Sequence, residues 1–165
     1  MSKPLSHFIE LLKTDPARLR GELTGPVLVT ALPEPDLLDD GPTQFFRAPS
    51  QANAAPASRS VYEVKKGDSQ KNAFAFGITI GRAAHNDVCV PDPSLSRFHA
   101  YLQQVKGGGW TLTDSESING TWVGALKLRP SEPVSISNNE RLRFGTVQLL
   151  FLDVEAFLRL IAERP

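Results

Sequence analysis

Seven consecutive residues just past the middle of the chain bring together side chains that can bind an anion. They read Ser94-Leu95-Ser96-Arg97-Phe98-His99-Ala100 and lead into an apolar segment. Ser96 offers a hydroxyl, Arg97 a guanidinium fork and His99 an imidazole, which are donors suited to an oxyanion. A polar turn with one histidine beneath it has the same composition. These seven residues alone therefore do not predict an anion site, and the prediction depends on residues elsewhere in the chain.

Further segments supply residues of the same kind in a fixed order. Gly81-Arg82 and Asn86-Asp87-Val88 come before the stretch, and Asp114 and Ser117-Ile118-Asn119-Gly120-Thr121 come after it. The Gly-Arg, the Ser-Arg-x-His and the Asn-Gly-Thr in this order resemble the forkhead-associated (FHA) domain, over roughly residues 58–153. The resemblance implies a β-sandwich that binds phosphothreonine peptides with loops at one end.

The resemblance also implies roles for individual residues. Arg82, Ser96 and Arg97 would contact the phosphate, and Asn119 would hold the peptide backbone with its amide. Physical chemistry points the same way, because a phosphothreonine carries about −1.5 to −2 charges and needs charged forks and oriented donors. Two local arginines suffice for this in a chain of zero net charge.

A second group of residues is expected to support the site from within. By the resemblance, His99 braces its loop from inside the fold, and Thr121 belongs to the same supporting group. Gly81 and Gly120 mark turns where a Cβ would clash. Ile118 departs from the family pattern, which often has Ser or Thr before this Asn, and it would enlarge the apolar contact to residues after the phosphothreonine.

Catalysis and metal binding are the rival interpretations, and the sequence disfavours both. Ser96, His99 and Asp114 have the residue types of a hydrolase triad, but no nucleophile elbow surrounds the serine. A metal would have to use His85, Cys89 and His99, which lack paired ligand spacing. We therefore expect no enzymatic activity, no metal and no cofactor.

From residue 61 onward the apolar pattern is that of short strands separated by turn residues. Lys106-Gly107-Gly108-Gly109 and Asn138-Asn139 are expected to form hairpin turns. Many short strands without helical patterns between them predict an all-β fold, an antiparallel β-sandwich. The expected strands span 61–65, 74–80, 87–90, 100–105, 110–113, 121–123, 141–144 and 147–152.

Helical patterns flank this region. Leu5, Phe8, Ile9 and Leu12 have the spacing of one helical face, and Asp15-Pro16 resembles a cap that starts a short second helix over 17–23. Residues 27–32 form an apolar run that predicts an added edge strand or an extended segment.

Asp153 resembles the N-cap of a closing helix over 154–163, and we expect this helix to pack on the N-terminal one. The expected organisation is a helical and extended N-terminal extension over 1–32, a Pro/Ala-rich linker over 33–59, an FHA-type sandwich over 60–153, and a C-terminal helix over 154–165.

The linker contains one feature of interest. Thr43 follows Asp39 and Asp40 and precedes Phe45 and Phe46. The simpler interpretation is an unmodified linker whose aromatic residues adhere to the domain. The alternative is a phosphorylation site at Thr43 that folds back into the chain's own site, where a short tether would raise its effective concentration.

Composition limits the partners. Eighteen basic and eighteen acidic residues give no net charge, which disfavours generic binding to nucleic acid or to anionic membranes. A single cysteine, Cys89, and the lack of a signal-like or membrane-spanning run predict a cytoplasmic location. The sequence favours a phosphothreonine-peptide adaptor downstream of a Ser/Thr protein kinase. Its alternatives are an interaction module with a vestigial phosphate site and an autoinhibited regulator phosphorylated on its own Thr43.

Overall fold

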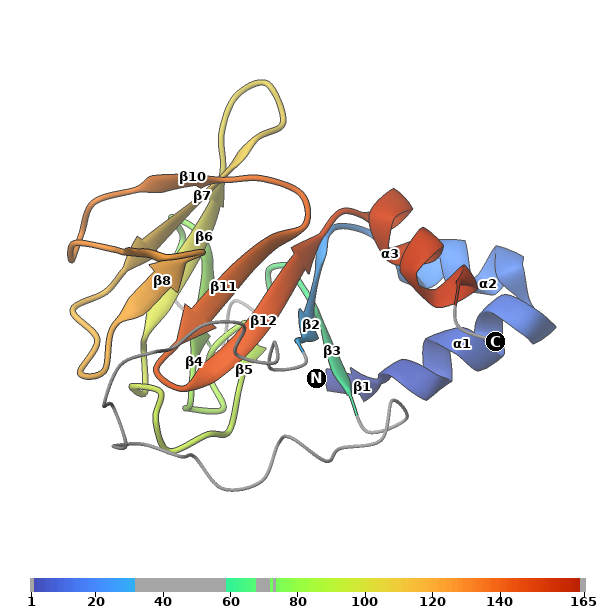
Figure 1. Cartoon of the computed structure of the whole chain (residues 1–165), viewed down its shortest axis with the longest axis horizontal. Helices are drawn as coiled ribbons and strands as arrows, with labels where there is room; N and C mark the ends of the chain where they lie inside the picture. Colours follow the sequence, from blue (N-terminus) through green and yellow to red (C-terminus); the bar gives the residue numbers. More distant parts are fainter. Residues whose placement is uncertain (1, 32–58, 68–71, 73, 164–165) are drawn as a thin grey trace, which may run out of the picture.

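The computed structural model describes residues 2–31, 59–67, 72 and 74–163, and within these residues two β-sheets face each other (Figure 1). The larger sheet has the order β1 (Ser2–Pro4), β3 (Ser60–Glu63), β2 (Val27–Thr30), β12 (Val147–Leu152), β11 (Glu140–Phe144), β8 (Thr121–Val123) and β9 (Leu126–Lys127). The smaller sheet has the order β10 (Val134–Ile136), β7 (Trp110–Asp114), β6 (Ala100–Gln104), β4 (Ile78–Gly81) and β5 (Val88–Cys89). The predicted β-sandwich is confirmed.

The core between the sheets follows from alternation along each strand. In β11, Leu142 and Phe144 are buried while the flanking Arg141 is exposed, since successive side chains point to opposite faces. Leu102 of β6 and Leu112 of β7 are fully buried and meet this cluster from the smaller sheet. The interior is thereby filled by both sheets.

A layer of helices covers one part of the larger sheet. These are α1 (Leu5–Thr14), α2 (Pro16–Glu22) and α3 (Val154–Ala162), which pack against side chains of β2, β3 and β12. The blue α1 and the red α3 lie side by side in Figure 1, and the rings of Phe8 and Phe157 meet edge to face at 5.3 Å. The predicted pairing of the terminal helices is therefore confirmed.

The helix starts obey the capping rules that the sequence suggested. The carboxylate of Asp15 accepts a hydrogen bond from the Arg18 amide at 3.0 Å, and that of Asp153 accepts one from the Ala156 amide at 2.7 Å. These bonds satisfy amides that have no partner within their helices.

Glu22 at the end of α2 ties the N-terminal elements together. Its carboxylate accepts hydrogen bonds from Lys3 Nζ at 2.8 Å and Arg18 Nε at 3.2 Å, and lies 3.3 Å from His7 Nε2. The bond from Lys3, followed by that from His7, lowers the pKa of Glu22 to about 2. The carboxylate therefore stays ionised at any ordinary pH.

The expectation of an edge strand at residues 27–32 is wrong. β2 lies inside the larger sheet, where Val29 pairs with Leu150 of β12 on one side and Val61 of β3 on the other. β1 pairs with β3, so the N-terminal segment supplies strands of the sandwich as well as helices. Nothing in residues 27–32 alone indicates these partners, which lie far away along the chain.

The strand predicted over 74–80 begins only at Ile78. The carbonyl oxygens of Phe74 and Gly77 accept hydrogen bonds from Lys66 Nζ, so these backbone groups are used outside the sheet. The pairing of β4 with β5 is parallel, an exception to the predicted antiparallel pattern. The short strands β1, β9 and β10 were not predicted.

The two predicted hairpin turns differ in outcome. Gly107 and Gly108, both with positive φ, join the paired strands β6 and β7, which confirms the first hairpin. Asn138-Asn139 instead joins β10 of the smaller sheet to β11 of the larger one, so it is not a hairpin.

The expected linker lies outside the described residues except for Arg59, and so does Thr43. None of the described helices is long and apolar enough to span a bilayer.

Candidate functional site

The predicted site residues come together where three connections meet. Arg82 follows β4, Ser96 and Arg97 lie between β5 and β6, and Asn119 lies between β7 and β8. β6 runs antiparallel to both β4 and β7, so the end of β4, the start of β6 and the end of β7 lie at the same end of the sheet. Residues that are up to 37 positions apart in the chain thus share one surface.

Arg82 is exposed, and its backbone and side chain are both fixed. Its amide donates to the carbonyl oxygen of Ser96 at 3.0 Å, and its Nε donates to that of Leu95 at 3.1 Å. The Nε bond orients the guanidinium and leaves the N–H donors of the two terminal nitrogens for a ligand. The arginine is therefore positioned before any ligand arrives.

Ser96 is half-buried, and its hydroxyl oxygen accepts a hydrogen bond from the Ile118 amide at 3.0 Å. With that lone pair occupied, the hydroxyl proton remains available to donate to an incoming acceptor. This contact also joins the Ser96 loop to the Asn119 loop.

Arg97 combines an exposed side chain with a fixed backbone. Its carbonyl oxygen accepts hydrogen bonds from the Ala83 amide at 3.2 Å and from Asn86 Nδ2 at 2.5 Å. Within the described part of the chain, no acceptor contacts the Arg97 guanidinium, so its whole fork is free for an anion.

Asn119 is exposed, and its Nδ2 donates to the Ser94 carbonyl at 2.8 Å. This bond uses one amide proton and leaves the other proton and Oδ1 for a peptide backbone. The neighbouring Ile118 is 89% exposed, which makes it the most exposed of the large apolar side chains in the described residues. An apolar side chain so exposed beside a polar site is available for contact with a ligand.

His99 is fully buried beneath these loops, and its bonds define its tautomer. The Ser96 amide can only donate, so His99 Nδ1 accepts from it at 2.9 Å. Nε2 therefore carries the proton and donates to the Gly120 carbonyl at 2.9 Å. Burial is the main cause that lowers the pKa of His99, opposed by the bond to Gly120 and the charge of Asp114. The neutral imidazole thus links the Ser96 loop to the Asn119 loop.

The two glycines of the pattern meet different requirements. A Cβ on Gly81 would collide with the backbone of Arg97 and lie 2.7 Å from Asn86 Nδ2, so the strand end can approach the Arg97 loop only as glycine. Gly120 has a φ of +89°, and a Cβ there would lie 2.9 Å from the Trp122 ring.

Asp114 organises the loop that carries Asn119. Its buried carboxylate accepts hydrogen bonds from the hydroxyls of Ser117 at 2.5 Å and Thr121 at 2.6 Å. Ser117 Oγ in turn accepts from the Gly120 amide at 3.0 Å. Since Asp114 bonds to this loop and His99 bonds through Nε2 to Gly120, the side chains of Ser96, His99 and Asp114 are not linked as a triad.

Two structural residues had no role assigned from the sequence. Asn86 donates to the carbonyls of Ala83 and Arg97, and Ser94 accepts from Asn119 through its carbonyl and from the Thr146 amide through its hydroxyl. Asn86 stands in the quoted pattern, and a short polar side chain beside a turn was the available signal.

Comparison with known proteins assigns this geometry to a family. The family model of the FHA domain matches residues 78–145, which include β4 and all the loops of the site. The chain contains an FHA domain. The match begins after α1, α2 and β1–β3, so the N-terminal part of the sandwich lies outside it.

Several curated proteins are similar to part of this chain. The chain is 32% identical over 77 residues to E3 ubiquitin-protein ligase rnf8 of Danio rerio, covering 39% of this chain and 16% of the ligase. It is 27% identical over 108 residues to glycogen accumulation regulator GarA of Mycolicibacterium smegmatis, covering 64% of this chain and 66% of GarA. The chain spans at most 16% of the length of the ligase and of three other relatives.

Among solved structures, the FHA domain of CT664 protein from Chlamydia trachomatis superposes with a TM-score of 0.51. The two share 19% sequence identity, and the superposition covers 78% of this chain and 97% of the other. This similarity concerns the fold alone.

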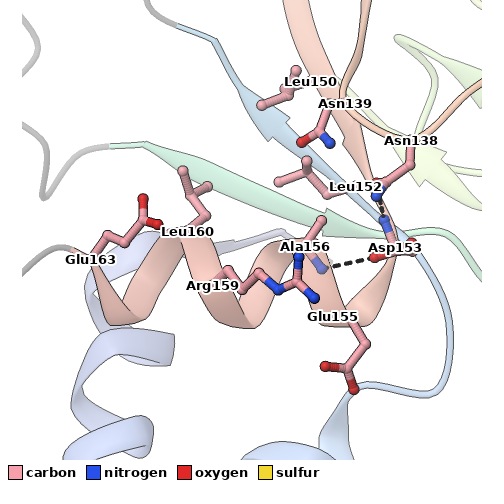
Figure 2. Close-up of a pocket in the computed structure, with 10 residues that line it drawn as sticks. All are labelled: Asn138, Asn139, Leu150, Leu152, Asp153, Glu155, Ala156, Arg159, Leu160 and Glu163. Carbon is pink, nitrogen blue, oxygen red and sulfur yellow. Dashed lines mark hydrogen bonds between the residues drawn. The ribbon is translucent and has the colours of Figure 1, made fainter.

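A groove elsewhere on the protein is unsuited to a phosphate. It has a volume of about 290 Å³ and lies between α3 and the β10–β11 connection (Figure 2). Asp153, Glu155 and Glu163 are among its lining residues, together with Arg159. Three acidic residues and one arginine give the lining a net negative charge, which disfavours a phosphate, so the groove does not compete with Arg82 and Arg97 for this role. Among the described residues, no three His, Cys, Asp or Glu side chains are grouped to hold a metal.

Proposed function

We propose that this FHA domain is a phosphothreonine-peptide-binding module that acts as an adaptor in Ser/Thr kinase signalling. The observation that carries the proposal is the convergence of Arg82, Ser96 and Arg97 on one surface, each with donors left for a ligand. A dianionic phosphate offers acceptor oxygens to match them. The family resemblance supports phosphothreonine as the residue that carries this phosphate.

The arrangement assigns a task to each donor. The Arg82 and Arg97 guanidinium groups form charge-assisted bonds to the phosphate, and the Ser96 hydroxyl adds a short bond. Asn119 holds the peptide backbone beside the phosphate. Ile118, exposed next to Asn119, contacts an apolar residue after the phosphothreonine. The proposal requires no chemical step, so the module binds without catalysing a reaction.

The test is a titration of the full chain with a fluorescent phosphothreonine peptide library and with its unphosphorylated counterpart. Phosphorylated peptides should bind more tightly, and Arg82→Ala should weaken binding roughly ten- to a hundredfold, as expected for one lost charge-assisted partner. Arg97→Lys should also weaken binding, because it keeps the charge and removes the fork.

The matched control is Arg20→Ala, which removes an exposed arginine from α2, far from the loops. It should leave affinity unchanged. Equal binding of phosphorylated and unphosphorylated peptides would mean that the phosphate site is vestigial, and the protein would then be an interaction module of another kind. A cytoplasmic location belongs to the proposal, in keeping with the free thiol of Cys89.

A further inference from the structure

Four aromatic side chains form a cluster beside the phosphate site. The cluster, here called the aromatic cluster, consists of Phe74, Phe76, Phe98 and Tyr101. Its contacting rings have centroids 5.0 to 6.3 Å apart, and Phe74 contacts each of the other three. Tyr101 belongs to β6 of the smaller sheet, and Phe74 and Phe76 come from the segment before β4. Phe76 is 76% exposed, so the cluster presents an aromatic ring to solvent.

The aromatic cluster adjoins the proposed phosphate site through Phe98 and Arg97. Phe98 directly follows Arg97 in the chain, and its ring stacks on Tyr101 at 6.3 Å. Phe74 lies 5.4 Å from Phe98 and 5.8 Å from Phe76, so the rings form a path that leads away from Arg97. Two such separations correspond to about three residues of extended peptide.

The backbone beneath Phe76 is held by several hydrogen bonds. Lys66 Nζ donates to the Phe74 and Gly77 carbonyls, and Gln103 Nε2 donates to the Phe76 carbonyl at 2.7 Å. Lys66 is itself paired with Asp87 at 2.9 Å, whose side chain is only 1% exposed. An exposed ring on so constrained a segment loses little backbone freedom when it binds a partner.

An exposed phenylalanine alone needs no explanation, but a pre-ordered aromatic cluster adjoining an anion site has the composition of a binding surface. Rigid aromatic side chains anchor protein interfaces because they bury large areas at low entropic cost. A phosphopeptide held at Arg97 would bring its flanking residues to Phe98, since extended peptide advances about 3.4 Å per residue.

We propose that the aromatic cluster binds apolar side chains of the same partner segment whose phosphothreonine occupies the Arg82, Ser96 and Arg97 site. The occupant is an extended peptide with apolar residues within about four positions of its phosphothreonine, because the two ring separations span about three residues and the step from Arg97 to Phe98 adds about one. The inference rests on the proposed function and adds a second recognition element to it.

The experiment compares three phosphothreonine peptides taken from the best-binding sequence of the library. One is short, with two residues on each side of the phosphothreonine. The others carry six-residue extensions on both sides, made of alternating leucine and serine in one and alanine and serine in the other. The leucine peptide should bind the full chain about tenfold more tightly than the alanine peptide, the gain expected for one well-buried apolar anchor.

Variants assign this gain to the aromatic cluster. Phe76→Ala should abolish the advantage of the leucine peptide and leave the short peptide unaffected, and Phe76→Leu should retain most of it. Leu126→Ala is the matched control, because Leu126 is an exposed apolar residue of β9 in the other sheet. This substitution should change neither the affinity for the short peptide nor the affinity for the leucine peptide. The advantage should persist at high salt, which screens the phosphate contacts and not the apolar ones.

The outcomes separate this inference from the proposed function. Tight binding of the short peptide without any gain from leucine overturns the inference alone. An equal loss of affinity for the short and the long peptides in Phe76→Ala would also overturn it. So would a self-association of the chain that Phe76→Ala abolishes, since a second copy of the chain would then occupy the aromatic cluster. The inference is also overturned if the leucine peptide keeps the same affinity advantage over the alanine peptide when both are unphosphorylated. Failure of every phosphopeptide to bind the folded protein overturns both proposals.

Discussion

At the scale of single residues, His99 determines how the site loops are joined. Its Nδ1 must accept from the Ser96 amide while its Nε2 donates to the Gly120 carbonyl. Only a neutral imidazole with the proton on Nε2 makes both bonds, because a protonated ring has no acceptor. In the proposed function, His99 is therefore a positioning residue that acts through Ser96 and the Asn119 loop.

This geometry predicts how stability depends on pH at His99. Burial lowers the folded-state pKa below its ordinary value, so the unfolded chain takes up a proton first as the pH falls. The stability contributed by His99 should be complete above about pH 6.5 and should decrease as the pH falls below that value.

The measurement is urea unfolding of the wild type and of His99→Gln at several pH values. The substitution should cost about 1–3 kcal/mol at pH 7.5, and this cost should shrink on acidification because glutamine does not titrate. Nitrogen NMR at neutral pH should find the ring proton on Nε2. A cost independent of pH, or a proton on Nδ1, would contradict the assignment.

At the scale of elements, the helical layer forms a second core separate from the interior of the sandwich. Phe157 of α3 and Phe8 of α1 are fully buried there, together with Leu5, Leu19 and Val61. The site loops contribute no residue to this core. Stability and ligand binding should therefore be separable by substitution.

Phe157→Ala should destabilise the protein by about 3–5 kcal/mol, because it removes a buried ring and leaves a cavity beside Phe8. Phosphopeptide affinity of the folded protein should not change. Denaturant unfolding and peptide titration below the transition measure the two effects, with the exposed Glu10→Ala on α1 as control. A large loss of affinity in Phe157→Ala would show that the helical layer and the site are coupled.

At the scale of the whole molecule, the N-terminal segment completes the sandwich. β2 stands between β3 and β12, so its removal would leave the edges of two buried strands unpaired. The helices α1 and α2 precede it and cover the same strands. The N-terminal elements thus belong to the larger sheet, and the smaller sheet that carries most of the site loops packs against that sheet through the shared core.

A truncated chain of residues 60–153, the sandwich boundaries expected from the sequence, should fail to fold for this reason. It lacks β1, β2 and the helical layer that covers Val61 and Leu152. Proton–nitrogen NMR spectra of the fragment and the full chain provide the test, and removal of residues 164–165 from the full chain serves as a control. A well-dispersed spectrum from the fragment would refute the prediction.

The sequence alone determined those features that depend on neighbouring residues. Asp15 and Asp153 cap their helices, the glycines after Lys106 turn a hairpin, and the strand period from residue 61 onward reflects local alternation. The order of Arg82, Ser96, Arg97 and Asn119 predicted the candidate site through its resemblance to the FHA motifs, which are a property of the sequence.

Only the tertiary structure decided the features that depend on distant partners. Val29 lies in a central strand because it pairs with Leu150 on one side and Val61 on the other. Phe74 lies outside β4, where its carbonyl oxygen accepts a hydrogen bond from Lys66 and its ring contacts Phe98. The physical reason is the same in both cases. Strand pairing and hydrogen bonds from a side chain to a distant backbone group are contacts between segments far apart in the chain, and no single segment determines their strength.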